Sequence, residues 1–135
     1  MPRPKSIKTL FRESKKKTAH FDEYQVDGSD APVHMSLFPG DTGQSAVTDI
    51  YLEDHVVEKG IIGTIENFLL GSNGFLNGKF LEVYTVISDV SNETNLTSFE
   101  FHLEGGIIPY DIKLEKTVQN QGDSVIYKMT IFFFH

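Results

Sequence analysis

The feature that most constrains this fold is a strict alternation of apolar and polar residues between Thr97 and Glu104. Successive side chains of a β-strand point to opposite faces, so residues two apart share a face. The two resulting sets are Phe99, Phe101 and Leu103 on one face, and Ser98, Glu100, His102 and Glu104 on the other. This pattern predicts a strand with one buried face and one solvated face.

Three further runs in the second half of the chain have the same character: 79–90, 108–118 and 124–134. The links between the four runs are short, and Gly105-Gly106 between two alternating runs indicates a hairpin. We therefore expect an antiparallel four-stranded meander over 79–134. Strands of this length coil strongly, which favours a closed or half-closed barrel over a flat open sheet.

The first half is less regular. Phe21–Val26, Val33–Phe38 and Ala46–Glu53 are expected to be strands, separated by turn-forming residues. The stretch 56–70 fits either a short helix capped by Thr64 or a further strand. Together the segments predict an all-β domain, either an antiparallel barrel or a two-sheet sandwich of about seven to eight strands, with at most one or two short helices.

Charge divides the chain into two parts. Residues 1–17 carry seven Lys and Arg against Glu13 alone, which is +6; the rest of the chain carries five Lys and Arg against eighteen acids, which is −13 and completes the net −7. We therefore distinguish a basic arm, 1–17, from a single β-domain, 18–135. A possible N-cap at Ser6 and helical spacing of apolar residues predict a short helix in the arm, with Ile7, Leu10 and Phe11 on one face.

Several classes of chemistry lack a signal. The chain has no cysteine, which excludes disulfides, thiolate metal sites and cysteine nucleophiles. The five histidines form no compact metal motif, and neither a nucleophile elbow nor a phosphate loop is present, so no metal or other cofactor is expected. No apolar run matches a secretory signal or a membrane span, so a cytoplasmic location is the default expectation.

His102 is the first candidate for acid–base chemistry, because Glu100 and Glu104 flank it on one strand face. If that face lined a barrel interior, burial would shift the pKa values of all three groups and make them an acid–base site. If Phe99 and its apolar neighbours point inward instead, the three groups form a solvated outer face, which hydrophobic burial favours.

A second candidate is the polar triplet Glu53, Asp54 and His55. It could supply a general base and a carboxylate that orients it. Because it follows a predicted strand, a solvated loop is the simpler interpretation.

The last strand is apolar on both faces over Ile131–Phe134. One face needs the core, and the other, which carries Phe132 and Phe134, needs a second cover. The basic arm offers a matching apolar stripe on an otherwise cationic segment. We therefore expect the arm or a second subunit to cover Phe132 and Phe134, with the contact residues Ile7, Leu10 and Phe11 on the arm.

Two functional hypotheses follow. The first is a non-catalytic β-domain that acts through protein–protein contacts, as a homo-oligomer or with a protein partner. The second is a β-barrel for a small apolar molecule, either a carrier or a metal-free isomerase or cyclase. Nucleic acid and membranes are weaker partners for the arm, because the acidic body repels phosphates and Phe11 is the arm's sole aromatic residue.

Overall fold

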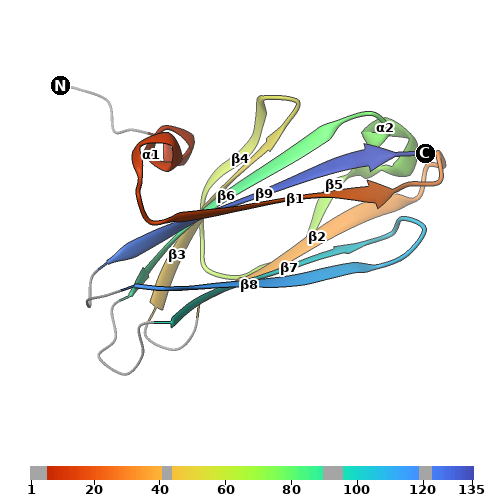
Figure 1. Ribbon diagram of the computed structural model, residues 1–135. Helices are drawn as coiled ribbons and strands as arrows, with labels where there is room; N and C mark the ends of the chain where they lie inside the picture. Colours follow the sequence, from red (N-terminus) through yellow and green to blue (C-terminus); the bar gives the residue numbers. More distant parts are fainter. Residues whose placement is uncertain (1–5, 41–43, 90–95, 119–122) are drawn as a thin grey trace.

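The structure is a computed structural model that describes residues 6–40, 44–89, 96–118 and 123–135. Residues 1–5 of the predicted arm, and most of the predicted links at 91–96 and 119–123, lie outside the described residues. Two β-sheets pack face to face, and two short helices lie outside them (Figure 1). The elements are α1 (Ile7–Glu13), β1 (Lys17–Gln25), β2 (Pro32–Pro39), β3 (Gln44–Leu52), β4 (His55–Ile62), β5 (Ile65–Ser72), α2 (Asn73–Leu76), β6 (Phe80–Asp89), β7 (Leu96–Glu104), β8 (Tyr110–Thr117) and β9 (Ser124–Phe134).

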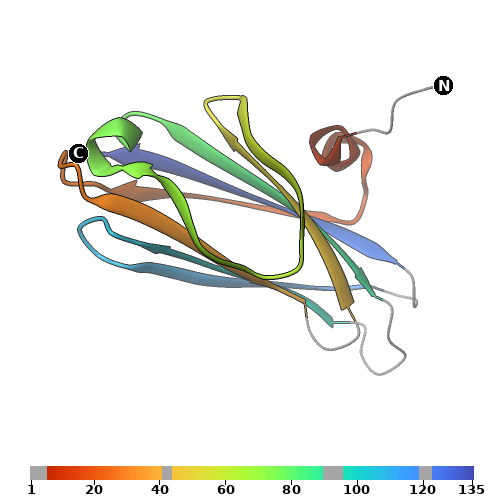
Figure 2. The ribbon, with the colours of Figure 1, turned by 180° about the vertical axis from the view of Figure 1, so that it is seen from behind.

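The fold is a β-sandwich, which is one of the two predicted architectures. Sheet A has the strand order β1-β9-β6-β3-β4, and sheet B has the order β5-β2-β7-β8. Every pairing is antiparallel except that of β1 with β9, which is parallel. Sheet B forms the second layer, and Figure 2 shows the sandwich from behind, with β5 of this sheet nearer the viewer than β8. The sheets do not close into a barrel, so β1, β4, β5 and β8 are edge strands.

The four strands predicted for the second half all form, but the predicted meander is wrong. β6 pairs with β9 and β3 in sheet A, whereas β7 pairs with β2 and β8 in sheet B. The β7–β8 hairpin is the one predicted link that joins neighbouring strands, and it spans the predicted Gly105-Gly106. Alternation assigns a strand its two faces, but it does not determine which strand pairs with it.

The ambiguous stretch 56–70 contributes to two strands, so the described residues form nine strands, more than the seven to eight predicted. The helical spacing in this stretch was misleading because Gly60 and Gly63 interrupt the strand alternation with positive φ angles of 68° and 79°. The helix that does form, α2, begins after Ser72, whose side chain accepts a hydrogen bond from the backbone N–H of Phe75 at 3.1 Å.

The core between the sheets is built on the predicted apolar faces. The inward residues of β9 are fully buried: Val125, Tyr127, Met129, Ile131 and Phe133. Across the sandwich, the ring of Phe99 stacks on Tyr127 with centroids 5.3 Å apart. The Tyr127 hydroxyl shares a 2.6 Å hydrogen bond with the Thr97 hydroxyl, which satisfies a polar group in the interior.

Asn73 fastens one end of the sandwich. Its side chain is fully buried and accepts a hydrogen bond from Asp27 N at 3.0 Å. The amide nitrogen donates to Ala31 O at 2.8 Å and to Gly105 O at 2.9 Å. One side chain thereby joins the β1–β2 link, α2 and the β7–β8 loop. No helix in the described ranges has the length and apolarity needed to cross a membrane.

Replacing Phe99 by Ala tests this core. Phe99 is fully buried, so we expect Phe99→Ala to lower the free energy of unfolding by about 3–5 kcal/mol in urea titrations. Phe38→Ala is the matched control on the outer face of sheet B, where Phe38 is 38% exposed, and should cost less than about 1.5 kcal/mol. Equal losses in the two variants would contradict the assignment of faces.

Candidate functional site

The outer face of sheet A carries the basic arm. Helix α1 begins after Ser6, whose hydroxyl accepts a hydrogen bond from Thr9 N at 3.2 Å. The helix packs on β6 and β9, with Ile7 buried against Tyr51, Tyr84 and Ile126. A helix this short is unstable alone, so its order comes from this packing.

Aromatic rings and cations line the contact. The ring of Phe11 lies edge-on to Tyr84 at 5.7 Å, and Tyr84 lies edge-on to Tyr51 at 5.8 Å. The Lys8 ammonium lies 5.2 Å from the centre of the Tyr51 ring, and that of Lys128 lies 5.7 Å from the centre of Phe11. The arm is therefore held by apolar burial together with cation–π contacts.

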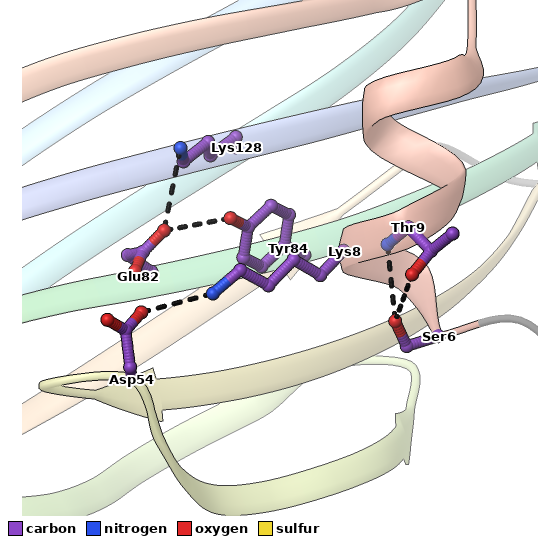
Figure 3. A network of polar contacts seen from close by, with 7 residues as sticks. All are labelled: Ser6, Lys8, Thr9, Asp54, Glu82, Tyr84 and Lys128. Carbon is purple, nitrogen blue, oxygen red and sulfur yellow. Dashed lines mark hydrogen bonds and ion pairs between the residues drawn. The ribbon is translucent and has the colours of Figure 1, made fainter.

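Figure 3 shows the polar contacts around this helix. Lys8 reaches from α1 to Asp54, with 3.1 Å between Nζ and Oδ1, and this hydrogen bond lowers the pKa of Asp54. The Tyr84 hydroxyl donates to Glu82 at 2.8 Å, and Lys128 lies 3.5 Å from the same carboxylate. Burial, followed by the bond to Glu82, raises the pKa of Tyr84 well above its ordinary value.

The arm covers a different part of β9 from the one expected. It lies over Ile126, whereas Phe132 and Phe134 stay half-buried further along the strand. Leu10 is 38% exposed and lines a depression of about 320 Å³ with Val86 and Ile126. The arm of the same chain thus covers part of this face, and it leaves the outer face open at the C-terminal end of β9.

That open part carries a second group of aromatic rings, which we call the aromatic patch: Phe21, Phe80 and Phe132. The rings of Phe80 and Phe132 have centroids 4.7 Å apart, and those of Phe21 and Phe80 are 6.3 Å apart. Phe21 is 56% exposed and Phe80 is 41% exposed. Adjacent, exposed phenylalanines on one sheet face are typical of an interaction surface.

His102 lies on the outer face of sheet B, as burial of Phe99 requires. Its Nδ1 contacts Asp111 Oδ1 on β8, and its Nε2 lies 3.2 Å from Glu100 Oε2. Burial alone would lower the pKa of His102, but the hydrogen bonds to Asp111 and Glu100 outweigh it and raise the pKa. Both ring nitrogens contact carboxylates, so the side chain acts as a cationic clamp between β7 and β8.

The remaining candidates do not converge on one point. Glu104 is exposed, and Asp111 takes the place expected for it beside His102. Glu53 and Asp54 form the two-residue turn between β3 and β4, with φ angles of 52° and 65°. Glu53 Oε1 accepts from Phe80 N at 2.9 Å, while Asp54 contacts Lys8.

His55 lies at the start of β4, beside a mostly apolar depression of about 240 Å³ that Val57 and Phe75 also line. In the part of the chain that the structure describes, no group of three or more His, Asp or Glu side chains is arranged to hold a metal ion. No family model, curated protein or solved structure matches this chain.

Sequence reasoning missed Asp111, Phe21 and Phe80 as site residues. Asp111 lies in an alternating strand, where a signal for the outward face was present. What the sequence did not show is that Asp111 lies opposite His102, and that Phe80 lies opposite Phe132. These neighbours depend on strand register.

The docked arm makes a stability prediction. Ile7→Ala removes the buried side chain of α1 and should lower the free energy of unfolding by about 1–3 kcal/mol, with increased binding of an apolar dye. Lys8→Ala removes a cation–π contact with Tyr51 and a surface ion pair to the 79%-exposed Asp54, and should cost less than Ile7→Ala. A neutral effect of Ile7→Ala would mean that the helix does not stabilise the sheet.

The His102 clamp makes a pH prediction. Because folding raises the pKa of His102, its stabilising contribution is complete below about pH 6.5 and is lost as pH rises through the folded pKa. His102→Gln should therefore reduce the free energy of unfolding more at about pH 5.5 than at about pH 9. The exposed His55 provides the control substitution, His55→Gln. A deficit of His102→Gln that does not change with pH would contradict the clamp.

Proposed function

We propose that this protein is a non-catalytic β-sandwich that acts through protein–protein contacts, made by the outer face of sheet A. The observation that carries the proposal is the aromatic patch, in which the Phe80 ring contacts the Phe132 ring, with centroids 4.7 Å apart, while Phe80 remains 41% exposed. Exposed aromatic side chains are enriched among the residues that dominate binding energy in protein interfaces.

The neighbouring half of the same face supports this assignment. Where α1 covers the sheet, Phe11 of the helix contacts Tyr84, which in turn contacts Tyr51, and Lys8 of the helix lies over the Tyr51 ring. The chain thus buries one aromatic group with its own helix and leaves the next group open. The aromatic patch therefore has the same chemistry as the neighbouring aromatic group, which α1 already covers.

The His102 cluster gives less support for catalysis. A general base needs a ring nitrogen that can take a proton from a substrate. Here both nitrogens of His102 face carboxylates, and the pKa is raised, which favours the charged form. Lys113 and Ile112 complete a shallow depression of about 300 Å³ rather than an enclosed site.

A carrier or cyclase for an apolar molecule would need an internal cavity. The described interior contains stacked rings instead, with Phe99 between Phe101 at 6.2 Å and Tyr127 at 5.3 Å. The described depressions open at the surface. These observations favour the contact hypothesis over the small-ligand hypothesis.

Site-specific photo-crosslinking tests the proposed surface. A photoreactive phenylalanine analogue replaces Phe80 in the full chain, in the cells that make the protein. Phe38 is the matched control, since it is 38% exposed on the opposite sheet and Phe80 is 41% exposed. We expect protein adducts at Phe80 in clear excess over Phe38, and fewer adducts after Phe132→Ser. Equal yields at the two positions would refute the proposal.

A further inference from the structure

We propose that this protein pairs with a second copy of the same chain by antiparallel pairing of their β1 strands, at the edge of the sheet that carries the aromatic patch. The inference rests on the proposed function and specifies it. An edge strand presents unpaired backbone groups and can extend its sheet with another chain. Of the four edges of this sandwich, β1 has the most suitable geometry and charge.

The geometry of β1 is regular. It pairs with β9 over nine consecutive positions without a register shift. By contrast, β4 and β5 have register shifts in their pairing, with positive φ at Gly60 and Asn67. Bulges of this kind twist an edge and discourage pairing, so β4 and β5 are protected while β1 is not.

Charge distinguishes β1 from β8, the other regular edge. Lys15, Lys16 and Lys17 precede or begin β1, and Asp22 and Glu23 lie near its end. The strand therefore has a basic end and an acidic end, and two copies match in charge when they run antiparallel. Along β8 the charges alternate in sign instead, as Asp111, Lys113 and Glu115.

The backbone fixes which residues can pair. Ile126 N donates to Lys16 O and Val26 N donates to Phe134 O, so the backbone N–H and C=O groups of even-numbered β1 residues are directed to β9. The backbone groups of odd-numbered residues then point away from β9, as Gln25 O does when it accepts a hydrogen bond from Ile107 N at 3.0 Å. The backbone groups at 17, 19, 21 and 23 are consequently directed to the outer edge.

A two-fold axis at His20 uses this whole set. It places Lys17 opposite Glu23 of the second copy, and Ala19 opposite Phe21, with about eight backbone hydrogen bonds between the strands. The N–H of Glu23, which donates to Asp22 Oδ1 at 2.9 Å, would exchange that acceptor for a carbonyl of the second copy.

Two neighbouring features fit this arrangement. A groove of about 370 Å³ lies at the acidic end of β1, lined in part by Asp22, Glu23 and Ile108. The chain of the second copy would bring Lys15 and Lys16 to this groove. Phe21 is 56% exposed in the single chain. In the dimer it would lie at the centre of a joint aromatic surface on the outer face, formed by both copies.

Sedimentation equilibrium of the full chain measures the dimer directly, against a monomer mass of 15.2 kDa. Ala19→Pro removes an outward N–H without touching the bonds to β9, whereas Ala19→Ser keeps it and serves as the control. Glu23→Lys places lysines opposite one another, and the double variant Lys17→Glu, Glu23→Lys restores opposite charges. Urea titrations of each variant test whether it is folded.

We expect a dimer whose Kd rises about tenfold or more in Ala19→Pro and in Glu23→Lys. Ala19→Ser and the double variant should lie within about threefold of the wild type. A wild type that stays monomeric up to about millimolar concentration, or a dimer indifferent to Ala19→Pro and Glu23→Lys, overturns the inference. If Phe80 still forms adducts with a different protein, the proposed function stands and only the identity of the partner is wrong.

Discussion

The structure depends on β9 being covered on both faces. Its inner residues fill the core, and its outer residues lie under α1 at one end and beside Phe80 at the other. A strand in water on one face could not carry Ile126 and Phe132 there without exposing large apolar surface. This requirement explains why a short cationic helix is ordered at all, and why β9 lies between β1 and β6 rather than at an edge.

Much of the fold could be predicted from alternation. Phe99, Phe101 and Leu103 are buried, as their spacing predicts, and β9 carries apolar side chains on both of its faces. The pairing of strands could not be predicted, because β6 and β9 meet only after the chain has passed through sheet B. The His102–Asp111 contact depends on the register of the β7–β8 hairpin, whose loop between Glu104 and Tyr110 is longer than the two predicted glycines. The sequence therefore indicated His102 and Glu100 but not Asp111.

The two outer faces of the sandwich differ in the kind of energy they can offer a partner. On sheet B, His102 is already paired with two carboxylates, so a partner would have to replace contacts that exist. On sheet A, Phe21 and Phe80 can still lose exposed apolar area. Burial of such area is favourable without any bond being broken first. This asymmetry is the physical reason for proposing a binding surface on sheet A rather than on sheet B.

The parallel pairing of β1 with β9 also has a consequence during synthesis. β1 is synthesised well before β9, with β2 to β8 between them in the sequence, although the two are immediate neighbours in the finished sheet. Contacts this distant in sequence slow folding. Until β9 emerges, β1 has no partner strand in sheet A, and the edge of β6 that pairs with β9 stays open. The nascent chain therefore passes through a long interval in which chaperone binding or premature association competes with closure of the sheet.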